Sequence, residues 1–289
     1  MKYILIVVGL AFLGPVVAHG AEADRTPRAI VATFYPIHIA LLNIAGGVEG
    51  VRVSSLAESQ TGCLHHYQLT TRDRAVLSKA EVLVVNGAGL ESFLDSRTLC
   101  RPGLKVIDAS AGLEMLVSEG ATNAHVWVSP SLHIRQVRTM AGELAKWDPV
   151  HAAEYTRNAE AYILRLEQLK GVMDATLRSV RRRDVITFHE AFPYFAHEFN
   201  LVIAGIIERE PGSSPSAAEM ATLIQLIRTS GVKTLFVEPQ YPAKVASSIA
   251  RETGATLYTL DPVVSGPAST NAYLMIMERN LAELKRALN

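Results

Sequence analysis

The segment Pro149–Arg178, PVHAAEYTRNAEAYILRLEQLKGVMDATLR, decides how the chain is organised. Its apolar residues recur at helical spacing, and no turn signal interrupts them before Gly171. The recurring residues are Tyr155, Ala159, Tyr162, Ile163, Leu166, Leu169, Val172 and Met173. A helix of ~30 residues spans about 45 Å, which is enough to run the length of a two-lobed molecule. We therefore expect one long helix over residues 148–180 that connects two lobes.

Strands and helices alternate on both sides of this segment. Before it, strands are expected at 28–34, 51–56, 81–85 and 104–108, and helices at 37–46, 72–79 and 130–146. After it, strands are expected at 184–188, 201–207, 233–238 and 256–260, and helices at 191–199, 215–230, 242–253 and 270–288. Such alternation is typical of parallel α/β sheets. The sequence predicts two α/β lobes, at 27–147 and 181–289.

The first twenty residues predict an export signal. Lys2 precedes an apolar run from Ile4 to Val17, and small residues follow at Ala18, Gly20 and Ala21. The run of ~14 residues is shorter than the ~20 that span a bilayer, although an uncleaved membrane anchor remains an alternative. No cysteine follows the run, so a lipid anchor is not indicated. We expect residues 1–20 to be a cleaved signal peptide and the mature chain to be periplasmic.

Composition narrows the function classes. Hydrophobic residues make up 49% of the chain, which is enough for a sizeable core. Lys+Arg and Asp+Glu are equal at 28 each, so no basic surplus favours nucleic acid. The two cysteines, Cys63 and Cys100, lie in the exported part, where an oxidising compartment favours a disulfide between them. A cysteine metal site and two separate thiols remain as alternatives.

Four histidines flank predicted strands or helix starts, where parallel α/β sheets place their ligand sites. His65 and His66 follow the strand at 51–56, His125 precedes a helix start, and His189 directly follows the strand at 184–188. Asp261 occupies the equivalent end of the strand at 256–260. Imidazoles with one carboxylate suit tetrahedral zinc. The other histidines are His19 in the signal and His38, His133, His151 and His197 on predicted helices.

The contexts of these residues carry a family resemblance. The segments are LHHYQLT at 64–70, AHVWVSP at 124–130, FHEAFPYF at 188–195 and LDP at 260–262. Their order, on both sides of one long helix, resembles that of the zinc-binding proteins of bacterial metal ABC importers, the helical-backbone metal receptors. The resemblance covers essentially the whole mature chain.

The resemblance implies a monomeric, non-catalytic receptor that captures one Zn²⁺ per chain between its lobes and delivers it to an ABC transporter membrane permease. It assigns the ligands to His65, His125 and His189, with Asp261 as the fourth. His66 and Glu190 are implied as neighbours that support the ligands. A histidine at 189, where manganese-type members tend to carry glutamate, favours zinc.

The chain also departs from the family pattern. The first motif lacks both prolines, having Leu64 and Leu69 instead, and a Cys63–Cys100 disulfide is a hypothesis for what shapes that loop. The short segment 110–123 predicts no histidine-rich, zinc-gathering loop. Other readings are a manganese or iron receptor of the same fold, a surface adhesin and a periplasmic zinc hydrolase using Glu190 as base. The sequence contains neither the His-Glu-x-x-His motif nor the nucleophile elbow expected of such hydrolases.

Overall fold

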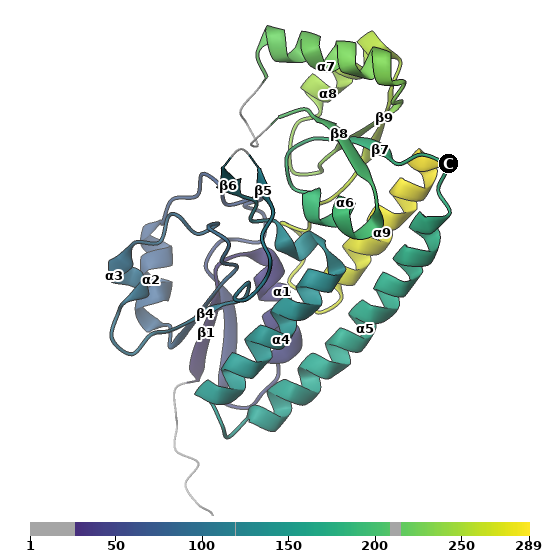
Figure 1. The fold of residues 1–289 in the computed structure, drawn as a ribbon. Helices are drawn as coiled ribbons and strands as arrows, with labels where there is room; N and C mark the ends of the chain where they lie inside the picture. Colours follow the sequence, from purple (N-terminus) through teal and green to yellow (C-terminus); the bar gives the residue numbers. More distant parts are fainter. Residues whose placement is uncertain (1–26, 119, 209–214) are drawn as a thin grey trace, which may run out of the picture.

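The structure is a computed structural model that describes residues 27–118, 120–208 and 215–289. The predicted signal peptide at 1–20, with His19, lies outside these residues. Among the described residues, two four-stranded parallel sheets form, one from strands that precede the long helix α5, Ala152–Arg178, in the chain and one from strands that follow it; α5 runs along one flank of the molecule (Figure 1). The predicted α/β architecture of two lobes is confirmed.

The N-terminal sheet has the order β2-β1-β3-β4. Its strands are β1 Arg28–Ala32, β2 Val51–Ser55, β3 Val82–Val85 and β4 Lys105–Asp108. All residues of β3 are buried, as expected of a parallel strand covered on both faces. Helices α1 Tyr35–Ile44 and α2 Thr71–Lys79 connect the first three strands, and α4 Pro130–Trp147 follows the sheet.

The C-terminal sheet has the order β10-β9-β7-β8. Its strands are β7 Asp184–Thr187, β8 Val202–Ile206, β9 Thr234–Val237 and β10 Thr256–Thr259. The helices of this half are α6 Pro193–Phe199, α7 Ala217–Ser230, α8 Lys244–Thr253 and α9 Ala272–Leu288. None of the described helices is long and apolar enough to cross a membrane.

Local sequence explains where several helices begin and end. Helix α2 starts with a capping box between Thr70 and Asp73, and α4 starts with the Ser129 side chain as N-cap and proline at the next position. Helix α7 ends at Gly231, whose φ of 70° is the left-handed conformation that glycine adopts without strain. The long helix expected over residues 148–180 begins instead at Ala152 and ends at Arg178.

Some short elements are not apparent from periodicity. They are helix α3 Ser96–Leu99, the β5–β6 hairpin of Val117–Ser118 with Ala121–Thr122, and the 3₁₀ helix η1 Val126–Val128. Each is too short to show a hydrophobic repeat. Two of them matter for the site, because the hairpin and η1 lie on either side of residues 123–125.

Both sheets share one hydrophobic core, which we call the central core. Successive strand residues point to opposite faces, so Ile30 of β1 and Val185 of β7 face the central core, whereas Val31 and Ile186 face separate outer clusters. Helices α1, α4, α5 and α9 fill the central core, and α5 packs against the other three. The two halves are therefore joined by packed side chains as well as by the chain.

Candidate metal centre

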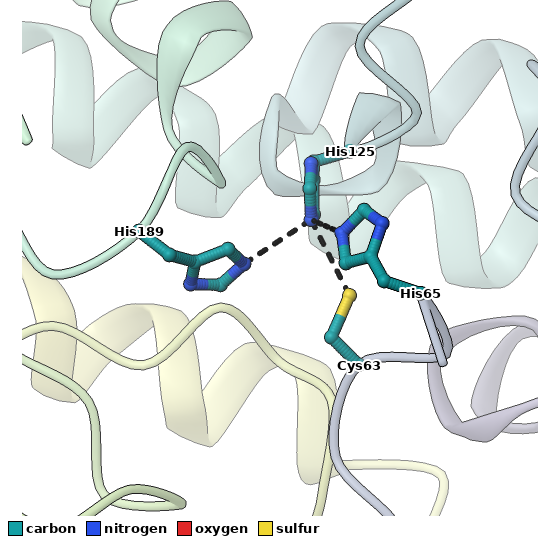
Figure 2. A group of neighbouring side chains, drawn as sticks. All are labelled: Cys63, His65, His125 and His189. Carbon is teal, nitrogen blue, oxygen red and sulfur yellow. Dashed lines mark hydrogen bonds between the residues drawn. The ribbon is translucent and has the colours of Figure 1, made fainter. Parts of the chain in front are cut away.

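Four side chains from both halves converge on one point (Figure 2). One potential ligand atom from each of Cys63, His65, His125 and His189 lies within 4.8 Å of all the others. Cys63 and His65 come from the loop between β2 and α2, His125 precedes η1, and His189 follows β7. We call this group the metal cluster.

The distances from His125 to the other members of the metal cluster are close to those between ligands of one zinc ion. Nε2 of His125 lies 3.1 Å from Nε2 of His65, 3.2 Å from Nε2 of His189 and 3.3 Å from Sγ of Cys63. Two nitrogens at zinc-binding distance and the tetrahedral angle lie roughly 3.3 Å apart, and a nitrogen and a sulfur roughly 3.6 Å. The side chains thus surround a volume of the size that a tetrahedral ion fills.

The His125 ring is fixed by Asn123. The Asn123 Oδ1 accepts hydrogen bonds from the His125 backbone N–H at 3.0 Å and from Nδ1–H at 3.1 Å. Its amide Nδ2 donates to the main-chain oxygen of Glu190 at 2.8 Å, which ties this ligand to the other half of the molecule. With the proton on Nδ1, the lone pair of Nε2 points into the metal cluster.

Burial keeps His125 neutral. Its side chain is 2% exposed, and burial, followed by the nearby His189 and His65, lowers its pKa well below the ordinary value. Imidazole binds a metal ion only when it is neutral. The environment therefore holds His125 in the form that binds metal.

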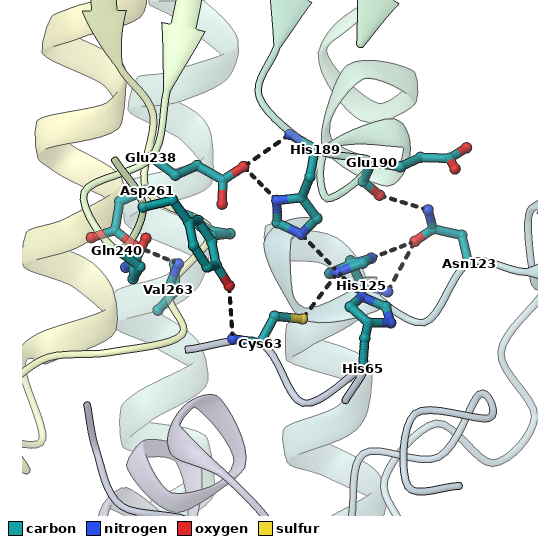
Figure 3. A network of polar contacts seen from close by, with 12 residues as sticks. Cys63, His65, Asn123, His125, His189, Glu190, Glu238, Gln240, Asp261 and Val263 are labelled. Atoms are coloured by element: carbon teal, nitrogen blue, oxygen red, sulfur yellow. Dashed lines mark hydrogen bonds and ion pairs between the residues drawn. The ribbon is translucent and has the colours of Figure 1, made fainter. Parts of the chain in front are cut away.

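The His189 ring is fixed by a buried carboxylate. Glu238, which directly follows β9, places Oε1 2.5 Å from Nδ1 of His189 and 3.2 Å from its backbone N. Both side chains are at most 2% exposed. The carboxylate holds the proton on Nδ1 and directs Nε2 to the metal cluster, an arrangement common behind zinc-bound histidines. Figure 3 shows Glu238 behind His189 and Asn123 behind His125, on opposite sides of the three rings.

Tyr241 of the C-terminal half holds the loop that carries Cys63 and His65. Its hydroxyl accepts a hydrogen bond from the Cys63 backbone N–H at 3.4 Å. Its ring stacks on Phe188 with centroids 5.7 Å apart. Gly62 has a φ of 81°, and a Cβ there would lie 3.2 Å from the tyrosine hydroxyl, so glycine permits the close approach.

The structure brings three predicted ligands together, His65, His125 and His189, but Asp261 lies outside the metal cluster. Its Oδ1 accepts hydrogen bonds from the backbone of Val263 at 2.8 Å and from Gln240 at 3.1 Å. Burial raises the pKa of this carboxyl. The Asp261 side chain thus closes the turn after β10.

The predicted disulfide between Cys63 and Cys100 does not form in the structure. Cys100 is exposed at the end of α3, whereas the Cys63 sulfur faces His125. In the structure, the loop is held by Tyr241 and by burial of Leu64, and the Cys63 sulfur is part of the metal cluster, as in the alternative of a cysteine metal site.

The predicted supporting residues differ from those that the structure provides. His66 is exposed, and Figure 3 shows the Glu190 carboxylate turned away from His189, although its main-chain oxygen binds Asn123. Sequence reasoning missed Asn123, Glu238 and Tyr241 as supports. Glu238 follows a predicted strand, so the rule that located the histidines also applied to it.

Comparisons with known proteins give a consistent result. Residues 30–287 match the family model described as "Zinc-uptake complex component A periplasmic". The high-affinity zinc uptake system protein ZnuA of Bacillus subtilis is 28% identical, over 93% of this chain and 90% of that protein. A crystal structure of ZnuA is 31% identical with a TM-score of 0.80, over 91% of this chain and 100% of that one.

A further solved relative holds other metals. The solute-binding protein FpvC of Pseudomonas aeruginosa, in complex with Ni²⁺, is 32% identical with a TM-score of 0.81, over 91% of this chain and 97% of that one. Another FpvC structure contains Mn²⁺.

Proposed function

Because the chain belongs to the family of periplasmic zinc-uptake components A, we propose that it captures Zn²⁺ in the periplasm and delivers it to an ABC-type membrane importer. The proposal includes one ion per chain, a monomeric receptor, a membrane permease as partner and export by the N-terminal signal. The family is one of solute-binding receptors, and the zinc uptake names of the relatives support this reading.

One observation carries the proposal: three imidazoles from both halves direct their Nε2 atoms at one another, at 3.1 and 3.2 Å from the central His125. The Nδ1 atoms of His125 and His189 face fixed acceptors, so their Nε2 atoms carry lone pairs. Lone pairs that face one another repel, and a cation between them converts the repulsion into attraction. A buried group of this kind is therefore suited to hold a metal ion.

The ligand chemistry favours zinc over manganese or iron. Nitrogen and sulfur atoms suit zinc, whereas manganese prefers carboxylate, carbonyl and water oxygens. The Glu238 carboxylate contacts the His189 ring from behind, at Nδ1, on the side away from the metal cluster. For a hydrolase, a base beside the metal is required, and the Glu190 carboxylate points away from the rings.

Competition with a chromophoric chelator tests this proposal on the metal-free mature protein. We expect one tight zinc per chain and a large loss of affinity in His125→Ala and in His189→Ala. His66→Ala is the matched control, because His66 is exposed and adjacent to a ligand. Tighter binding of manganese than of zinc would overturn the metal assignment, and equal losses in the control and the ligand variants would overturn the site.

A further inference from the structure

The Cys63 side chain lies where a fourth ligand of a tetrahedral ion is needed. Its sulfur is 3.3 Å from Nε2 of His125 and within 4.8 Å of the ligand atoms of His65 and His189. In Figure 2, the Cys63 sulfur and the rings of His65 and His189 all point at the His125 ring. The sulfur-to-nitrogen separation is close to the roughly 3.6 Å of a zinc site that includes a thiolate.

The chain offers no comparable carboxylate at this position among the described residues. Asp261 is committed to Val263 and Gln240, at 2.8 and 3.1 Å, and lies outside the metal cluster. Glu238 is committed to His189. Either of these two carboxylates could reach the ion only after its hydrogen bonds break, whereas the Cys63 sulfur already lies there.

The main chain holds Cys63 in this position from both sides. Its backbone N–H donates to Tyr241 of the C-terminal half, and the next residue, Leu64, is fully buried in the central core. The preceding residue, Gly62, closely approaches the same tyrosine. The position of the Cys63 main chain is therefore set by contacts with both halves.

We propose that the Cys63 thiolate is the fourth metal ligand, which makes this chain a receptor for thiophilic divalent ions such as zinc and one that rejects manganese. The proposal rests on the capture function above and names its ion class. As the metal–sulfur bond forms, the thiol proton passes to solvent, so one proton is released per ion bound at Cys63. A soft sulfur strengthens binding of borderline ions and contributes little to binding of hard ones.

Cobalt substitution tests the metal–sulfur bond directly. The metal-free mature protein is titrated with Co²⁺, and a sulfur-to-cobalt charge-transfer band is expected in the near ultraviolet at one equivalent. The band should be absent in Cys63→Ser and unchanged in Cys100→Ser, the matched control at the exposed cysteine. Stoichiometric cobalt binding without the band, or a band that survives Cys63→Ser, would overturn the proposal.

Selectivity provides the second measurement. Cys63→Asp replaces sulfur by oxygen, so the ratio of zinc to manganese affinity should fall by at least about tenfold, while Cys100→Asp should leave it unchanged. An unchanged ratio in Cys63→Asp would contradict the assignment. Circular dichroism of the metal-free variants checks that they fold.

If the unaltered chain bound no metal, the capture function itself would fail. Binding without the cobalt band or the selectivity change would remove only the role of Cys63.

Discussion

Glu238→Gln isolates the contribution of the buried carboxylate behind His189. The Oε1 atom lies 2.5 Å from Nδ1, and neither side chain is more than 2% exposed. A metal ion bound at Nε2 withdraws electron density from the ring and makes Nδ1–H a stronger donor. A carboxylate gains from this change and a neutral amide gains less. Glutamine keeps an oxygen in place, so the variant removes the charge and retains the hydrogen bond.

The size of the effect follows from the difference between two kinds of hydrogen bond. A bond to a charged group contributes about 1.5–3 kcal/mol and a neutral one about 0.5–1.5 kcal/mol. The midpoints of these two ranges differ by about 1.3 kcal/mol, which corresponds to roughly a tenfold weaker zinc affinity. Glu238→Ala removes the acceptor altogether and should cost up to about 100-fold, the upper end for partners of metal-bound histidines.

Chelator competition at fixed pH measures both affinities, with Glu190→Gln as the matched control. Glu190 is adjacent to His189, but its carboxylate points away from the rings. The metal-free Glu238→Gln protein should be at least as stable to urea as the parent. The reason is that Oε2 of Glu238 is buried and has no hydrogen-bond partner among the described residues. Unchanged affinity in Glu238→Gln, or an equal loss in Glu190→Gln, would refute the reasoning.

Three further outcomes are expected. Tyr241→Phe removes the acceptor of the 3.4 Å bond from Cys63 and should weaken zinc binding only a few-fold in the same competition assay, since a neutral bond contributes about 1 kcal/mol. Asn123→Ala frees the His125 ring and should weaken zinc binding about tenfold or more. An affinity equal to that of the parent would contradict the role of Asn123 in orienting His125. Burial lowers the pKa of His133 to about 4, so its neutral form is favoured in the folded state. Its contribution to stability is therefore complete above about pH 6.5 and falls by about 3 kcal/mol as the pH approaches 4. Urea unfolding of the metal-free parent and of His133→Asn at pH 7 and 4.5 measures this, and an identical pH dependence in both would contradict it.

The alternation of elements was predictable because each strand and helix carries its own hydrophobic pattern. The ends of these elements were less predictable. The long helix begins at Ala152 because the chain turns just before it, where the Asp148 carboxylate accepts hydrogen bonds from His151 and Tyr155. This interaction depends on side-chain positions that periodicity does not encode.

The candidate ligands were predictable to the extent that they follow from strand ends, as His189 does. The residues that support these ligands could not be predicted in this way. Cys63 meets His125 across 62 residues of chain and Tyr241 across 178, so its role depends on how the two halves pack. Export suggested a disulfide for that cysteine, and only the path of the loop shows that its sulfur lies among the rings.

The central core shared by the two sheets also has a consequence for unfolding. Helices α5 and α9 bury residues in the central core, to which strands of both sheets contribute, so neither half retains a complete core once the other has melted. Loss of stability should then be cooperative. Despite its two sheets, the metal-free chain should show one calorimetric peak, whose measured enthalpy equals the van't Hoff value.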